Sequence, residues 1–62
     1  MEYVYYFKKN GENIPILTGG AEIYHDIVFL SQELKEKLRQ DFPDAVGNLF
    51  VHVDGIDFKI DF

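Results

Sequence analysis

The sequence contains no cysteine and no tryptophan, and it has only two prolines among its 62 residues. Without cysteine there can be no disulfide bonds and no thiolate metal ligands, which fits a reducing, cytoplasmic location. A chain of this length buries only about 60% of its unfolded surface, so we expect a single domain of low stability. No secretory signal is expected, and no stretch approaches the roughly 20 apolar residues of a transmembrane helix.

Basic residues are also scarce, because six Lys and Arg stand against eleven Asp and Glu, for a net charge of −5. Phosphate groups and anionic membranes are bound by clustered Lys and Arg, so the composition predicts no direct contact with nucleic acid or membrane. What the chain does have is apolar: 47% of its residues are hydrophobic, with four tyrosines and six phenylalanines. Such a composition predicts a folded globule with more aromatic rings than one small core needs.

Residues 48–62 have the clearest pattern, that of a β-hairpin. Asp54-Gly55 is a type I′ turn sequence, and it sets the register of both strands. One face is then expected to carry the apolar pairs Val53–Ile56, Val51–Phe58 and Leu49–Ile60. The other face is expected to carry Phe50–Lys59, His52–Asp57 and Asn48–Asp61. A shift by one residue would expose the whole apolar set, so the register is well specified.

A second hairpin is predicted over residues 2–18, with Asn10-Gly11 as its turn. Its register gives the pairs Lys9–Glu12, Phe7–Ile14, Tyr5–Ile16 and Tyr3–Thr18 on one face. The other face receives Lys8–Asn13, Tyr6–Pro15 and Val4–Leu17, so both faces are apolar. Pro15 cannot donate a backbone hydrogen bond, which predicts an edge strand or an interruption there. Gly19-Gly20 is expected to end the strand in a turn.

Residues 31–42 predict a helix. Ser31 is a good N-cap, Leu34, Leu38 and Phe42 form an apolar stripe, and Pro43 ends the helix. The preceding segment 23–30 has two interpretations. Its β-branched and aromatic residues favour an extended segment, which we prefer, but Ile23, Ile27 and Leu30 would also continue the helical stripe.

The resulting prediction is an α+β fold, in which two hairpins form a single antiparallel sheet of four to five strands packed on one helix. The single domain 1–62 would comprise hairpin 2–18, extended segment 23–30, helix 31–42 and hairpin 48–62. The expected core between helix and sheet is Leu34, Leu38, Phe42, Val51, Phe58 and Ile60.

No catalytic, cofactor or metal site is predicted. The two histidines, His25 beside Asp26 and His52 opposite Asp57, lack the spacing of a metal site. The chain has one serine and one threonine and no cysteine, so candidates for a nucleophile are few, and we expect no enzyme.

The function predicted from the sequence is protein binding. One helix can cover only one face of the sheet, so the other face, with Val4, Tyr6, Leu17 and Phe50, is expected to bind a partner protein, most economically a second copy in a homodimer. A competing interpretation is that segment 21–30 folds over this face. The alternative function is an acidic inhibitor that mimics DNA and covers a basic site, suggested by Asp44, Asp54, Asp57 and Asp61.

Overall fold

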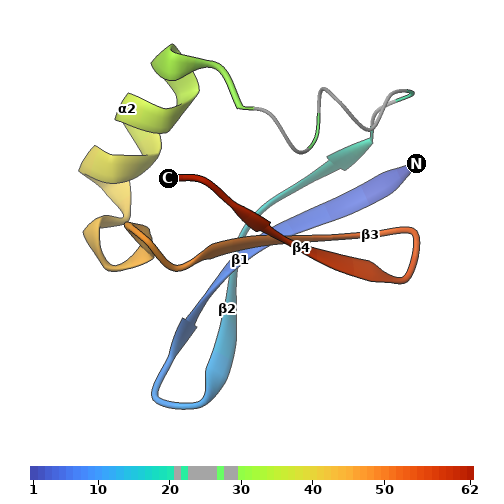
Figure 1. Ribbon diagram of the computed structural model, residues 1–62, viewed down its shortest axis with the longest axis horizontal. Coiled ribbons are helices and arrows are strands. Elements are labelled where there is room, and N and C mark those ends of the chain that lie inside the picture. The colour runs from blue at the N-terminus through green and yellow to red at the C-terminus, as the bar shows by residue number, and fades with distance from the viewer. Residues whose placement is uncertain (21, 23–26, 28–29) are drawn as a thin grey trace.

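The computed structural model describes residues 1–20, 22, 27 and 30–62 (Figure 1). Its elements, in chain order, are β1 (Glu2–Lys9), β2 (Glu12–Gly20), α2 (Gln32–Asp41), the 3₁₀ turn η1 (Pro43–Ala45), β3 (Leu49–Val53) and β4 (Ile56–Ile60). The strands form one antiparallel sheet in the order β2-β1-β3-β4. The predicted α+β fold, with two hairpins joined in a single sheet, is therefore confirmed.

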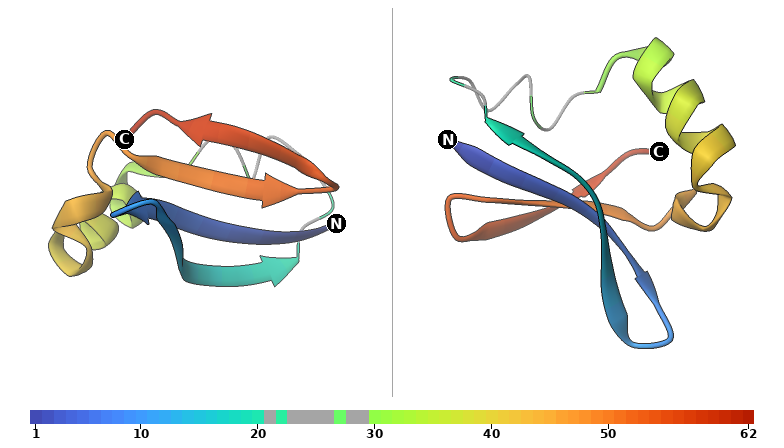
Figure 2. Two further views of the ribbon diagram at one scale, coloured as in Figure 1. Left: turned by 90° about the horizontal axis from the view of Figure 1, so that it is seen from below. Right: turned by 180° about the vertical axis from the view of Figure 1, so that it is seen from behind.

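The two hairpins meet through β1 and β3, which lie side by side at the centre of the sheet (Figure 2). Their register pairs Tyr5 with Val51 and Tyr6 with Phe50. Because paired residues point to the same face, the core face consists of three rows across the sheet. These rows are Phe7–Leu49–Ile60, Tyr5–Val51–Phe58 and Tyr3–Val53–Ile56.

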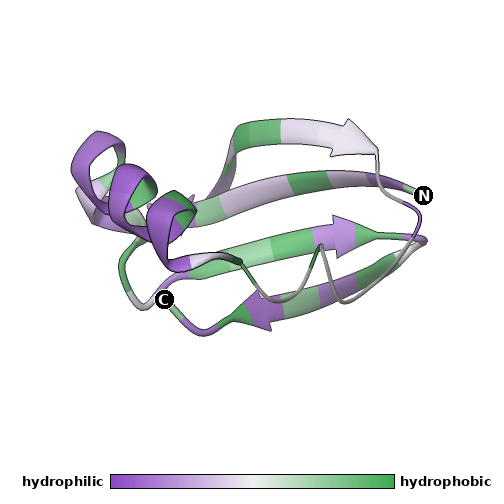
Figure 3. Cartoon of the chain, turned by 90° about the horizontal axis from the view of Figure 1, so that it is seen from above, coloured by the Kyte–Doolittle hydropathy of each residue, from purple (hydrophilic) through white to green (hydrophobic). Residues whose placement is uncertain are grey.

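The register of the C-terminal hairpin is the predicted one from Val53–Ile56 to Leu49–Ile60. Asp54 and Gly55 have φ values of 52° and 76°, as a type I′ turn requires. One member of the predicted apolar set departs from expectation, because Ile56 is 50% exposed. Helix α2 lies at the end of the sheet where β3 begins (Figure 3), whereas Ile56 follows the turn at the other end of β3.

The register of the N-terminal hairpin is correct only from the turn to Tyr6–Pro15. Beyond that pair β2 contains a bulge, so the predicted pairs Tyr5–Ile16, Val4–Leu17 and Tyr3–Thr18 are wrong. The observed pairs are Tyr5–Leu17, Val4–Thr18 and Tyr3–Gly19. The bulge follows the proline, which cannot donate to the ladder, and β2 is an edge strand as predicted.

The prediction that Gly19-Gly20 ends the strand is also wrong, because β2 continues through both glycines. The ring of Tyr3, on the neighbouring strand, lies over Gly19. A Cβ on Gly19 would come within 2.6 Å of the Tyr3 hydroxyl and 2.8 Å of its Cζ. The ring of Tyr3 fills the space that a side chain at position 19 would otherwise occupy. This packing stabilises the strand conformation at Gly19.

Helix α2 lies one residue inside each end of the predicted range 31–42, because both end residues are caps. The Oγ of Ser31 accepts a hydrogen bond from the Leu34 amide at 3.2 Å, and Phe42 is the C-cap before Pro43. Of the six predicted core residues, Leu38, Val51 and Ile60 are buried, and Leu34, Phe42 and Phe58 pack against the core half-buried. The core also contains Tyr5, Phe7, Ala45, Leu49 and Val53.

Most of the segment 23–30 lies outside the described residues, and so does the prediction of its conformation. Its two described members, Ile27 and Leu30, are buried in the same core as Leu38. The Tyr5 hydroxyl donates a hydrogen bond to the Ile27 carbonyl oxygen. Ile27 and Leu30 therefore pack on the same face of the sheet as α2.

Candidate functional site

The second face of the sheet, which we call the open face, carries the residues that alternate with the core. It has two complete rows of side chains, Pro15–Tyr6–Phe50–Lys59 and Thr18–Val4–His52–Asp57, flanked by Lys8 and Asn13. Helix α2, Ile27 and Leu30 all pack on the opposite side. No described segment covers the open face.

An aromatic pair occupies the middle of the open face. The rings of Tyr6 and Phe50 stack with their centroids 5.5 Å apart and an interplanar angle of 15°. The Lys8 ammonium lies 4.7 Å from the centre of the Phe50 ring, a cation–π contact. These neighbours leave only 8% of Tyr6 exposed. The apolar area of the open face is thus smaller than the sequence predicts, but its aromatic side chains are held in fixed positions.

A hydrogen-bonded network adjoins this pair and crosses three strands. The Tyr6 hydroxyl on β1 donates to Oδ1 of Asp57 on β4 at 2.8 Å. The same oxygen lies 3.1 Å from Nδ1 of His52 on β3. The hydrogen bond from Tyr6, followed by that from His52, lowers the pKa of Asp57. Burial, and then the hydrogen bond to Asp57, raises the pKa of Tyr6. At neutral pH the network therefore holds a carboxylate and a neutral phenol.

Next to the network is an open groove of about 410 Å³. It is lined by Val4, Tyr6, Asn13, Pro15, His52 and Asp57. Val4, Tyr6 and Pro15 give this lining apolar surface, and the other three residues give it polar groups, a combination typical of binding surfaces. The groove joins residues from all four strands, so it exists only when the two hairpins have formed one sheet.

The structure brings together three of the four predicted partner-binding residues. Val4, Tyr6 and Phe50 share the open face, as predicted. Leu17 does not join them, because the bulge places it opposite Tyr5, a residue of the core face. The contact between Tyr6 and Asp57 was not predicted. Only the alignment of β1 with β3 could have revealed it, and no local signal encodes that alignment.

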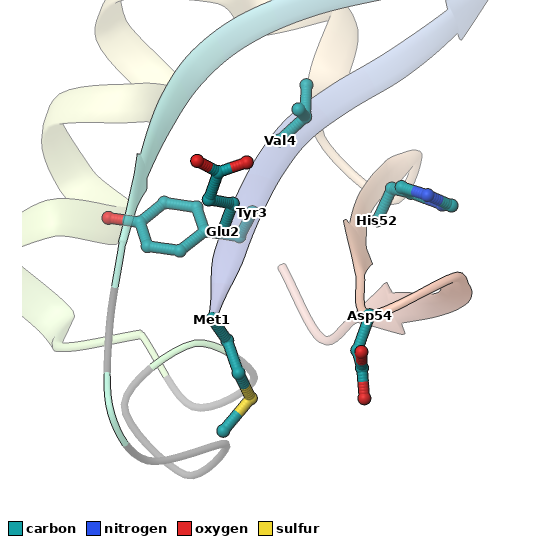
Figure 4. A pocket seen from close by; sticks show the side chains of 6 residues that line it. All are labelled: Met1, Glu2, Tyr3, Val4, His52 and Asp54. Atoms are coloured by element: carbon teal, nitrogen blue, oxygen red, sulfur yellow. The ribbon is translucent and has the colours of Figure 1, made fainter.

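A second hollow, of about 380 Å³, lies at the end of the sheet where β1 begins (Figure 4). It is lined by Met1, Glu2, Tyr3, Val4, His52 and Asp54. Its side chains diverge: the Tyr3 ring extends toward β2, whereas His52 extends from β3 and Asp54 from the turn that follows β3, each in another direction. Since the ionisable groups do not converge on one point, the hollow has no arrangement suited to acid–base chemistry.

Within the described residues, no three His, Asp or Glu side chains come together in a way that could hold a metal ion. His25 lies outside those residues. The described part of the chain also has no helix with the length and hydrophobicity needed to cross a bilayer.

Comparison with protein-family models, with curated proteins and with solved structures found no match for this chain. Its function must therefore be inferred from the open face itself.

Proposed function

We propose that the chain is a small, non-catalytic protein-interaction module that binds a partner protein on the open face. The observation that carries this proposal is the aromatic pair Tyr6–Phe50 beside the groove, on a face that no described segment covers. Protein interfaces are enriched in tyrosine and phenylalanine at their centre and have a polar rim. On the open face, His52, Asp57 and the two lysines Lys8 and Lys59 would form that rim.

The network supports the proposal because it pre-organises the surface. Tyr6 is fixed by stacking on Phe50 and by its hydrogen bond to Asp57, so little side-chain freedom remains to be lost when a partner binds. Loss of that freedom typically costs about 0.5–1.5 kcal/mol per side chain, and a pre-formed anchor avoids most of it. Because Tyr6 itself is buried, it acts by holding Phe50 and Asp57 in position, and these more exposed side chains are the ones a partner would contact.

The chemistry of the network argues against catalysis. A general base works best with a pKa near the working pH, whereas the hydrogen bonds to Asp57 lower its pKa. His52 and Asp57 have about half of their side-chain surface exposed, and water there weakens any electrostatic effect on a substrate. The proposal includes a cytoplasmic location, because a chain without cysteine needs no oxidising compartment to fold.

The alternative of a DNA-mimicking inhibitor receives less support. Asp57 is engaged with Tyr6 and His52, and Asp44 forms an ion pair with Lys9 at 3.0 Å. Asp44 and Asp54 lie at opposite ends of β3, so these acids do not form the closely spaced rows of a DNA backbone.

The test uses two lysine substitutions of similar size on different surfaces. Val4→Lys places a charge in the groove, whereas Val46→Lys places one at a residue that is 51% exposed and lies outside the open face. Proteins captured from a host extract by the immobilised chain would be quantified by mass spectrometry. We expect Val46→Lys to retain the partners of the wild type and Val4→Lys to lose them.

Thermal melting of each variant must accompany the capture, because loss of binding is informative only for a folded chain. Asn13→Lys, at an exposed residue that lines the groove from the edge strand β2, serves as a second groove variant. Equal capture by the wild type and by both folded groove variants would contradict the proposal.

A further inference from the structure

The two edge strands of the sheet differ in how they are protected. Strand β2 has Pro15 and a bulge, two devices that prevent an edge from pairing with another chain. Strand β4 has neither: its five residues contain no proline or glycine, and they pair with β3 without interruption. Figures 2 and 3 show no described segment alongside the outer side of β4.

The register identifies the backbone groups on that outer side. The Asp54-Gly55 turn is closed by hydrogen bonds between Val53 and Ile56, and hydrogen-bonded pairs alternate along an antiparallel ladder. Ile56, Phe58 and Ile60 therefore direct their backbone N–H and C=O groups toward β3. Asp57 and Lys59 direct theirs outward, so β4 presents two donors and two acceptors at the edge.

We propose that β4 pairs with β4 of a second copy, antiparallel and centred on Phe58, so that two sheets join into one of eight strands. In this register Asp57 lies opposite Lys59 of the second copy, and Lys59 lies opposite its Asp57. Both are hydrogen-bonded pairs made by the outward backbone groups, and each also brings opposite charges together. On the core face, Ile56, which is 50% exposed, gains Ile60 of the second copy as a neighbour.

The sequence of β4, Ile-Asp-Phe-Lys-Ile, is complementary to itself in this register alone. Its alternation of charged and apolar residues is visible along β4 in Figure 3. A shift of two residues in either direction would place Asp57 opposite Asp57 or Lys59 opposite Lys59. A shift of one residue would bring the core face of one copy beside the open face of the other. A parallel pairing in register would also align like charges, and a parallel pairing shifted by two residues would not be symmetric. Charge, face and two-fold symmetry together therefore select one arrangement.

The network on the open face favours the same arrangement. In the described part of the chain, both hydrogen bonds to Asp57 use Oδ1, which leaves Oδ2 for Lys59 of the second copy. Edge pairing does not cover the open face, so the dimer and the proposed partner site are compatible. The dimer proposal also does not depend on that function, and each can fail while the other stands.

The first test is sedimentation equilibrium of the full chain. Pairing of two short strands buries less surface than the standard interface of about 1,600 Å², so we expect a weak dimer. Monomer and dimer should both be detected at chain concentrations of about 5–500 µM. Lys59→Asp and Asp57→Lys each turn two attractive pairs into repulsive ones. Each variant alone should dimerise roughly 10- to 100-fold more weakly than the wild type. An equimolar mixture of the two should form a heterodimer, because every pair in it is again of opposite charge.

A second pair of variants tests the backbone contacts. Lys59→Pro removes one outward N–H donor without affecting the ladder to β3, and proline is tolerated at such edge positions. Lys59→Ala removes the same side chain but keeps the donor. We expect the folded Lys59→Pro variant to be monomeric and Lys59→Ala to retain a dimer. A monomeric wild type, failure of the charge variants to associate on mixing although both are folded, or dimerisation of Lys59→Pro at wild-type strength would overturn the proposal.

Discussion

Replacement of Gly19 by alanine tests the packing of Tyr3 on the edge strand. The added Cβ would lie 2.6 Å from the Tyr3 hydroxyl and 2.8 Å from Cζ, so the ring must move. Overpacking of this kind typically costs about 1–3 kcal/mol. Alanine in a strand recovers roughly 0.5–1 kcal/mol of backbone entropy relative to glycine. We therefore expect Gly19→Ala to lower the free energy of unfolding by about 1 kcal/mol, which for a domain of this size lowers Tm by about 4–8 °C.

Gly20→Ala is the matched control. Its Cβ would meet only the Met1 carbonyl oxygen, at an ordinary 3.6 Å, and neither glycine has a positive φ. This variant should melt at or slightly above the wild-type temperature. Thermal unfolding followed by circular dichroism measures both. In a Tyr3→Ala background the extra methyl has room, so Gly19→Ala should there cost nothing. If Gly19→Ala were as stable as Gly20→Ala in the wild-type background, the contact with Tyr3 would be refuted.

Three further predictions concern the core, the helix and the response to pH. Leu49→Ala, at a fully buried position, should cost about 2–5 kcal/mol, whereas Ile56→Ala at its half-exposed site should change stability by less than about 1 kcal/mol in urea unfolding. Ser31→Ala should cost about 0.5–2 kcal/mol through loss of the cap on Leu34, and Ser31→Asp should retain most of it. Burial, then the neighbouring Tyr3, raises the pKa of Tyr5 from 10.0 to about 12. Its contribution to stability is therefore complete below pH 10 and decreases as pH rises toward 12, and Tyr5→Phe should flatten the stability profile over that range.

The parts of the fold that could be predicted are those encoded by local chemistry. Asp54-Gly55 and Asn10-Gly11 define two turns, and the alternation beside Asp54-Gly55 defines the whole C-terminal register. Ser31 and Pro43 set the limits of the helix in the same way. The bulge in β2 could not be placed, because proline excludes a regular ladder without specifying which residue becomes the extra one. The extension of β2 through Gly19 depends on the ring of Tyr3, which is distant in sequence.

The candidate site was predictable only in outline. Alternation placed Val4 and Tyr6 on one face of the N-terminal hairpin, and it placed Phe50 on one face of the C-terminal hairpin. The assumption that the two hairpins align their cores joined these faces correctly. The contact of Tyr6 with Asp57 spans 51 residues and depends on the alignment of β1 with β3. That alignment is set by the packing of the core rows, so no short-range pattern reports it. Leu17 was assigned to the wrong face for a local reason, the bulge at the preceding residue.

The central position of β1 has a consequence for folding. Strand β1 precedes the other three strands in the sequence, yet one of its two neighbours, β3, begins forty residues after β1 ends. The N-terminal hairpin can form early from local contacts, but the β3 side of β1 then remains an unpaired edge lined by aromatic residues. Pairing with β3 requires closure of a long loop, which slows folding and prolongs exposure of that edge to aggregation. A chain truncated before Leu49 should therefore aggregate and not persist as a folded hairpin.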